Sequence, residues 1–262
     1  MDGVAHHRAI WLSDVHLGSR GCRAGLLLDF LDHNSCDVLY LVGDIVDLES
    51  LRRSFYWPKI HTRVLERFLQ MSREGTTIYY VPGNHDDDFR ALAGTRIGTI
   101  EVRRNVIHTT ANGRRLLVLH GDEFDSTLKC GLLAVLTAGV GYPFLLTLNR
   151  MSNAIHSVIC RRPYWSLAQY VKLRIGKAVR YVNRFQDACL KAARERNLDG
   201  VICGHIHKAD VAERDGLIYC NDGDWVESCT ALVESQRGLL SIVFWPQLTN
   251  KHRSALPLRD AA

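Results

Sequence analysis

Short runs of apolar and β-branched residues recur along the chain, and each is followed by a turn-forming or polar residue. The first five such runs are Ala9–Ser13, Val38–Val42, Thr76–Val81, Arg115–Leu119 and Gly200–Cys203. Runs of this length that end at turn residues are typical of buried strands. The same pattern predicts three further strands near the C-terminal end, at Leu217–Cys220, Thr230–Val233 and Leu239–Phe244.

Two segments between the early strands have the apolar spacing of helices. One is Ala24–Asp32, and the other is Lys59–Arg73, in which Ile60, Val64 and Phe68 fall on one side. Strands that alternate with helices predict a layered α/β fold, an α+β sandwich in which helices cover packed sheets.

Residues 126–185 interrupt this alternation. The stretch opens with an uncharged apolar run, Cys130–Leu148, and continues with a helical pattern over Leu167–Phe185. We therefore expect residues 126–185 to form a helical cap inserted into a core made of residues 1–125 and 186–262.

The apolar run of the cap is close to the length of a membrane-spanning helix. It has three interpretations, namely packing against the core, lining a pocket for an acyl chain, or dipping into one leaflet of a bilayer. The N-terminal residues Met1–Arg8 lack the apolar segment of a signal peptide, so we expect a cytoplasmic protein. The eight cysteines form no CxxC pair and are interpreted as buried free thiols.

The net charge of +5 is concentrated in the cap, because no acidic residue lies between Asp125 and Asp187. The basic residues there are Lys129, Arg150, Arg161, Arg162, Lys172, Arg174, Lys177, Arg180 and Arg184. A segment of one sign favours an anionic partner such as a phosphate, a nucleic acid or a lipid headgroup surface, and the alternative is a solvated basic face. Nucleic acid is disfavoured because the segment has no regular array of aromatic residues for base stacking.

Polar residues follow five of the predicted strands directly. They form the motifs Ser13-Asp14-Val15-His16, Gly43-Asp44, Gly83-Asn84-His85-Asp86, His120-Gly121-Asp122 and Gly204-His205-Ile206-His207. In α/β sheets the loops at the carboxyl ends of strands meet in one crevice, so these side chains should converge. Carboxylate and imidazole donors together suit manganese, zinc or iron.

Local geometry gives two reasons for the spacing within these motifs. Alternate residues of an extended chain point the same way, which would aim the ends of Asp14-Val15-His16 at one site. Glycines before Asp44, Asn84 and His205 would allow sharp turns at the strand ends. Histidines that match no motif position are interpreted as structural, among them His6, His7, His33, His61, His108 and His156.

The five motifs, in this order, resemble those of the calcineurin-like metallophosphoesterase family. The resemblance implies a four-layer α-β-β-α core and two divalent metal ions, with Mn²⁺ expected and Zn²⁺ or Fe as alternatives. The first ion would take Asp14, His16 and His207, and the second Asn84, His120 and His205. Asp44 would bridge the two ions, because only a carboxylate offers an anionic oxygen to each. The resemblance also makes His85 the residue that contacts the phosphoryl group and protonates the leaving oxygen, with Asp86 orienting it.

Within that family the sequence is most similar to bacterial UDP-2,3-diacylglucosamine pyrophosphohydrolases of lipid A synthesis. The similarity lies in the opening Leu12–Gly18, in an insertion after His120-Gly121-Asp122, and in the ending Asn221–Glu227. It implies hydrolysis of a UDP-linked acylated sugar to UMP and an acylated sugar phosphate, at the inner face of the cytoplasmic membrane.

One residue departs from that group, which has Arg where this chain has His85. The departure leaves open a phosphodiesterase or phosphatase for another nucleotide or lipid phosphoester. Independently of His85, a nuclease could use the basic stretch, and a scaffold of the same fold without catalysis is an alternative of another class.

Overall fold

The computed structural model describes residues 4–125, 167–245 and 255–256. The chain divides into two compact units, one of Met1–Glu123 with Cys189–Ala262 and the other of Phe124–Ala188. The first unit contains both sheets of the described chain. The apolar run Cys130–Leu148 and most of the expected cap lie outside the described residues.

The larger sheet has eight strands in the order β13-β12-β11-β1-β2-β3-β5-β4. Their bounds are Ala255–Leu256, Leu240–Phe244, Thr230–Glu234, Ala5–Leu12, Asn34–Val42, Thr77–Val81, Ile100–Val102 and Arg96–Ile97, in that order. Strands β1, β2, β3 and β5 run parallel, while β11 pairs antiparallel with β1 and places Val233 opposite Ile10. The parallel strands bring the ends of β1, β2 and β3 to one edge.

The smaller sheet has five strands in the order β6-β7-β8-β10-β9. Their bounds are Val106–Thr109, Arg115–Val118, Gly200–Cys203, Leu217–Asn221 and Asp210–Arg214, in that order. Its three central strands are parallel, so β7 and β8 also end together.

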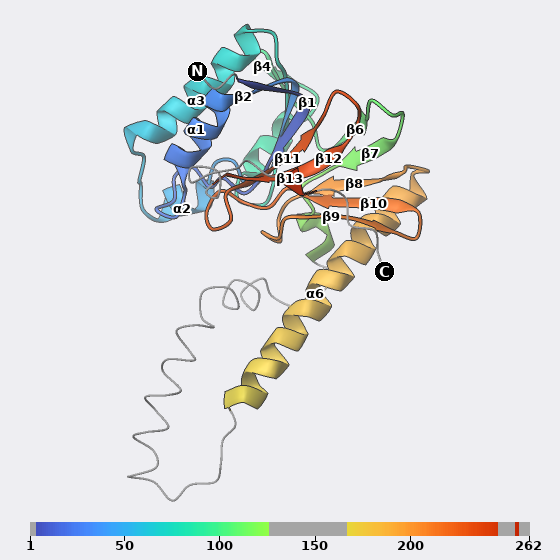
Figure 1. Cartoon of the computed structure of the whole chain (residues 1–262). Coiled ribbons are helices and arrows are strands. Elements are labelled where there is room, and N and C mark those ends of the chain that lie inside the picture. Colours follow the sequence, from blue (N-terminus) through green and yellow to red (C-terminus); the bar gives the residue numbers. More distant parts are fainter. Residues whose placement is uncertain (1–3, 126–166, 246–254, 257–262) are drawn as a thin grey trace, which may run out of the picture. The chain divides into compact units, whose positions relative to one another are not determined.

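Helices α1 (Ala24–His33) and α3 (Lys59–Arg73) cover one face of the larger sheet (Figure 1). Ile10 and Leu12 of β1 point into this layer and share a core with Phe30 of α1. Successive side chains of β1 point to opposite faces of the sheet, and Ala9 and Trp11, on the other face, belong to a second core.

The second core joins the two sheets. Trp11 stacks on Tyr40 with ring centroids 5.3 Å apart, and this core also includes Val118 of β7 and Ile202 of β8. The far face of the smaller sheet is covered by the end of helix α6 (Leu167–Glu195), where the buried thiol of Cys189 lies beside that of Cys203. The layers are therefore α-β-β-α, which confirms the predicted fold class.

Helix α6 begins at Leu167 as predicted and continues past Phe185 to Glu195. Within the second unit, the Tyr181 hydroxyl donates to Asp125 Oδ1 at 2.5 Å. Among the residues the structure describes, no helix has the length and apolar character needed to cross a bilayer. The described cysteines are free, and all except Cys22 are buried, as expected.

Three short elements complete the described chain. They are helix α2 (Leu48–Arg53) and the 3₁₀ helices η1 (Asp87–Leu92) and η2 (Asp122–Phe124). The Asp47 side chain caps α2 by accepting a hydrogen bond from the Ser50 amide.

Candidate metal centre

The loops after β1, β2, β3, β7 and β8 meet at one edge of the two sheets. The Asp14 amide donates to the Gly43 carbonyl at 3.0 Å, and the His16 amide donates to the Asp44 carbonyl at 2.9 Å. The Gly204 amide donates to the His120 carbonyl at 3.1 Å. Backbone hydrogen bonds thus tie the loops together before any side chain contributes.

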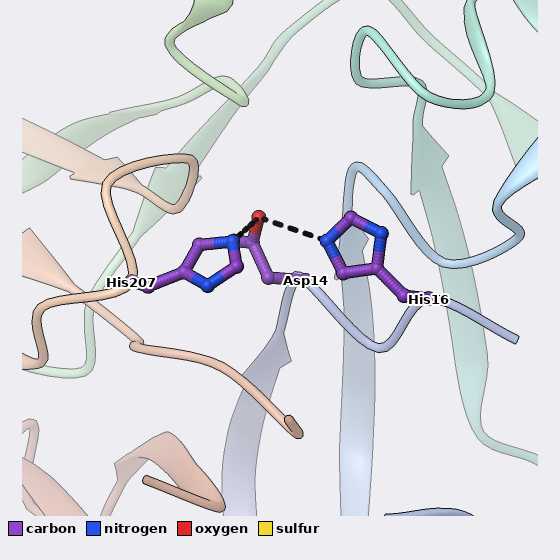
Figure 2. Close-up of side chains that lie close together, drawn as sticks. All are labelled: Asp14, His16 and His207. Atoms are coloured by element: carbon purple, nitrogen blue, oxygen red, sulfur yellow. Dashed lines mark ion pairs between the residues drawn. The ribbon is translucent and has the colours of Figure 1, made fainter. Parts of the chain in front are cut away.

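Asp14, His16 and His207 form one group of potential ligands, and their side chains point toward one another in Figure 2. His207 Nε2 lies 3.0 Å from Asp14 Oδ1, and His16 Nε2 lies 3.9 Å from the same oxygen. The ligand atoms of the group all lie within 4.8 Å of one another. This is the set expected for the first ion.

Asp44, His120 and His205 form a second group with the same spacing. His120 Nε2 lies 3.5 Å from Asp44 Oδ2, and the His120 and His205 rings are 5.1 Å apart. His120 Nδ1 lies 2.8 Å from the Val42 carbonyl oxygen, which can only accept a hydrogen bond. Nδ1 therefore carries a hydrogen, which leaves Nε2 as the ring nitrogen that could bind a cation after losing any proton of its own.

Asp44 lies between the two groups. Its Oδ2 is 3.5 Å from His120 Nε2 and 4.0 Å from His16 Nε2. Its Oδ1 instead accepts a hydrogen bond from the His85 amide at 2.8 Å. Our expectation of one carboxylate oxygen per cation is therefore wrong, because a single oxygen faces both groups.

Two buried polar atoms of these groups lack a hydrogen-bond partner among the described residues, namely Asp14 Oδ1 and His120 Nε2. His207 Nε2 lies 3.0 Å from Asp14 Oδ1, so a protonated His207 ring forms an ion pair with this oxygen in the metal-free chain. A buried polar atom without a partner costs about 1–3 kcal/mol. Cations would satisfy both atoms, and the mixed oxygen and nitrogen donors fit a divalent transition metal.

The glycines of the motifs are needed mainly for space. A Cβ on Gly83 would lie 2.7 Å from the Asp44 amide nitrogen, and one on Gly204 would lie 2.5 Å from Ser13 Cβ. Only Gly43 combines this crowding with a positive φ, of 83°. Gly83 and Gly204 have no positive φ, so at these two positions glycine is required for the close approach of neighbouring loops.

Five expected ligands have left-handed backbone: Asp14, His16, Asp44, His205 and His207. The backbone of the D-x-H and H-x-H segments is therefore not extended, and the prediction that it is extended is wrong. A left-handed L residue costs about 1–2 kcal/mol, so the packing of the two sheets stabilises a strained constellation.

The charges of the centre shift its titration strongly in the metal-free chain. Burial alone would raise the pKa of Asp14, but the nearby imidazoles, His207 first, lower it far below its ordinary value. Burial opposes the charged form of His207, yet the Asp14 carboxylate raises the pKa of His207 to about 9. A metal ion must therefore displace a proton from this pair.

Ser13 and Asp222 support the Asp14 carboxylate from behind. Ser13 Oγ lies 2.5 Å from Asp14 Oδ2 and 2.6 Å from Asp222 Oδ1. Both contacts need a proton, and the hydroxyl supplies only one. Burial raises the pKa of Asp222 well above its ordinary value, so Asp222 is the neutral acid that donates to Ser13, and Ser13 donates to Asp14.

His85 lies at the edge of the centre, with its ring 4.7 Å from that of His16. Its Nδ1 lies 3.1 Å from Asp47 Oδ1, and Asp47 Oδ2 lies 3.4 Å from His16 Nδ1. The hydrogen bond with Asp47 raises the pKa of His85. The sequence analysis missed Asp47, although an aspartate before a helical segment signals an N-cap.

Asp86 does not orient His85 as we expected. It accepts hydrogen bonds from the Gly83 amide at 2.6 Å, the Ile45 amide at 2.8 Å and the Tyr80 hydroxyl at 2.5 Å. Asp86 therefore ties the loop after β3 to the loop after β2, and the orienting contact belongs to Asp47.

The remaining expected ligand, Asn84, is exposed between Gly83 and His85. Several histidines outside the motifs take part in hydrogen bonds away from the two groups. The His61 ring accepts from the Gly18 amide at 3.0 Å, and His108 Nε2 lies 2.9 Å from Glu234 Oε2. His156 lies outside the described residues.

Comparison with known proteins gives one family match and several distant relatives. The profile of the calcineurin-like phosphoesterase family matches residues 7–209. A UDP-2,3-diacylglucosamine hydrolase of Porphyromonas gingivalis is 25% identical and aligns with 82% of this chain and 88% of its own. The hydrolase of the same name from Chromohalobacter salexigens is 31% identical, over 43% of this chain and 46% of its own.

Among solved structures, the Escherichia coli phosphoesterase Yfce matches with a TM-score of 0.48 and 15% identity, over 95% of this chain and 96% of its own. The family match itself covers most of the chain, from β1 to the segment that carries His205 and His207. The chain therefore belongs to the calcineurin-like phosphoesterase family and is a metal-dependent phosphoesterase.

Proposed function

We propose that this protein hydrolyses the pyrophosphate bond of a UDP-linked acylated sugar, such as UDP-2,3-diacylglucosamine, to UMP and an acylated sugar phosphate. The observation that carries the catalytic part is Asp44 Oδ2, which faces both ligand groups at 3.5 and 4.0 Å. One shared carboxylate oxygen between two sets of imidazoles is what a pair of neighbouring cations requires.

The first cation would be held by Asp14, His16 and His207, and the second by Asn84, His120 and His205, with Asp44 common to both. Mn²⁺ is the expected ion, and Zn²⁺ or Fe suit the same donors. Two such ions supply an activated water and stabilise charge on the phosphoryl oxygens.

His85 is the proposed general acid. Its Nδ1 is held by Asp47, so Nε2 is the ring nitrogen left to face a substrate. The same hydrogen bond raises the pKa of His85, which keeps the ring protonated nearer to neutral pH. His85 can therefore donate a proton from Nε2 to the oxygen that leaves phosphorus.

The substrate assignment is supported by the relatives, which are named UDP-2,3-diacylglucosamine hydrolases. It is also supported by the sequence of the insertion, which combines the apolar run Cys130–Leu148 with basic residues and no acidic ones before Asp187. An acyl chain gains about 0.8 kcal/mol for each methylene it buries, and the cations suit a diphosphate.

We further propose that the protein works in the cytoplasm, bound at the inner face of the cytoplasmic membrane through its basic insertion. Arg180 and Arg184 are exposed on α6, where anionic headgroups could pair with them. Sedimentation with phosphatidylglycerol vesicles should decrease as salt increases, whereas salt-independent binding or no binding contradicts this location.

The catalytic proposal is tested by assaying the purified protein with Mn²⁺ on UDP-2,3-diacylglucosamine and on a nitrophenyl phosphodiester. Asp44→Ala should lose turnover on both substrates, and Asp37→Ala, which removes an exposed aspartate of β2, should retain it. Hydrolysis of the generic ester alone removes the lipid substrate but keeps the phosphoesterase. Metal binding without turnover on any ester favours a scaffold.

A second candidate function is hydrolysis of another nucleotide or lipid phosphoester. The observation that favours it is His85, because the UDP-2,3-diacylglucosamine pyrophosphohydrolases have Arg at that position. A panel of nucleotide diphosphate sugars with and without acyl chains separates the two candidates by kcat/KM.

A further inference from the structure

The segment between α2 and α3 carries three consecutive aromatic residues, Phe55, Tyr56 and Trp57. Phe55 is 81% exposed, the highest value among the large hydrophobic side chains of the described residues. A single exposed apolar residue is ordinary in a folded protein. The two rings that follow it in sequence, Tyr56 and Trp57, are half-buried.

Tyr56 and Trp57 are fixed by their neighbours. The guanidinium carbon of the exposed Arg20 lies 4.6 Å from the centre of the Tyr56 ring. The His61 ring meets Tyr56 and Trp57 edge-on at 5.9 and 5.4 Å. We call Arg20, Phe55, Tyr56, Trp57 and His61 the aromatic wall.

The aromatic wall is joined directly to the metal centre. The amide of Gly18, two residues after His16, donates to the His61 ring at 3.0 Å. The Asp47 amide donates to the Leu17 carbonyl at 2.8 Å, and α2 runs from Asp47 toward Phe55. The two loops that carry the wall are therefore the continuations of the loops that carry His16 and Asp44.

The charges beside the wall are largely neutralised. Arg52 pairs with Asp88, and Arg53 pairs with Glu49. The surface is therefore unlike a cationic patch that binds an anionic membrane. Flat rings with a single stacked guanidinium, next to a site for phosphoryl groups, instead suit a planar heterocycle linked to a phosphate.

We propose that Arg20, Phe55 and Tyr56 of the aromatic wall bind the heteroaromatic base of a nucleotide whose phosphate lies at the metal centre. This inference rests on the proposed function, because it gives the nucleotide half of the substrate its own subsite. Stacking of one base on aromatic side chains changes affinity by about 5- to 150-fold.

The test compares UMP with ribose 5-phosphate, which lacks the base, as inhibitors of nitrophenyl phosphodiester hydrolysis by the Mn²⁺-loaded full-length protein. We expect UMP to bind at least about tenfold more tightly than ribose 5-phosphate to the wild type. In Phe55→Ala and Arg20→Met this preference should fall toward unity, with most of the loss in UMP affinity. Leu239→Ala removes another exposed apolar side chain, 51% exposed, and should keep the full preference.

A preference for UMP that survives both substitutions overturns the subsite. So does a wild type that binds the two inhibitors equally, and so does a Phe55→Ala variant that loses only binding to phosphatidylglycerol vesicles. If the wild type hydrolyses no ester, the proposed function fails first, and calorimetric titration of UMP and ribose 5-phosphate then decides the subsite separately.

Discussion

Replacing Asp222 by asparagine should change metal binding little, whereas replacing it by alanine should weaken metal binding clearly. Asp222 is completely buried, and its Oδ1 lies 2.6 Å from Ser13 Oγ. Because proton counting makes Asp222 a neutral donor, the amide of asparagine can replace the acid without a change in charge. Alanine at position 222 leaves Ser13 without this donor, so the hydrogen bond from Ser13 to Asp14 is less well fixed.

The size of the effect follows from the position of Ser13 behind a metal ligand. Loss of a hydrogen-bond partner outside the ligand shell typically lowers metal affinity about 10- to 100-fold. We expect this loss for Asp222→Ala and a change of less than about threefold for Asp222→Asn. Calorimetric titration of the metal-free proteins with Mn²⁺ gives both values.

Asp224 provides the matched contrast two residues away. Its carboxylate accepts hydrogen bonds from the amides of Val226, Glu227 and Ser228, so it has no need of a proton. Asp224→Asn should therefore destabilise the turn, which thermal unfolding measures. The reasoning about Asp222 is refuted if Asp222→Asn folds normally but loses tenfold or more in Mn²⁺ affinity.

Further predictions from the same structure concern Glu234, Asp47 and His207. Glu234 is buried and accepts hydrogen bonds from Arg8 and the Ala111 amide beside His108, so Glu234→Ala should lower the free energy of unfolding in urea by about 3–5 kcal/mol. Burial raises the pKa of Glu234, but the hydrogen bond with His108 lowers it, and the net change is a decrease. The Glu234 carboxylate therefore stabilises the fold fully above about pH 4.5, and this stabilisation is lost in acid. The prediction is contradicted if the stability of the wild type below about pH 4.5 falls no more steeply than that of Glu234→Gln. Asp47→Asn should lower kcat and move the basic limb of the pH profile to lower pH, because the hydrogen bond to Asp47 raises the pKa of His85; an unmoved limb argues against His85 as the acid. Mn²⁺ affinity should rise between about pH 6.5 and 9 with release of protons, because His207, with a pKa of about 9, must lose its proton, and a pH-independent affinity contradicts the ligand role.

The strands and helices with strong periodicity could be predicted from the sequence. Helix α3 occupies Lys59–Arg73 as predicted, because its apolar side packs on the larger sheet over the whole length. Strands β4, β5, β6, β9 and β13 were not predicted, since they are short and some, like Arg96–Ile97, carry charged or exposed residues. These segments are strands because they pair with neighbouring strands, and no local sequence pattern encodes that pairing.

The identity of the potential ligands could also be predicted, but the reasons for their arrangement could not. Left-handed backbone at Asp14 and His16 depends on contacts with the loop after β2, which no local pattern contains. Asp222 is 209 residues from Ser13 in sequence, so their contact was invisible before the fold was known. Asp47 had a local signal, as a helix cap, but its bond to His85 required the tertiary structure.

The two ligand groups draw on both sheets, since Asp14, His16 and Asp44 follow strands of the larger sheet while His120, His205 and His207 follow strands of the smaller one. Bound ions would therefore link the two sheets, because each ion would be coordinated by side chains from both. At a concentration one hundred times its dissociation constant, a bound ion stabilises the packed arrangement of the two sheets by about 2.7 kcal/mol. Removal of the ions by a chelator should consequently destabilise the packing of one sheet on the other. Conversely, separation of the two sheets should release the metal before the rest of the chain unfolds.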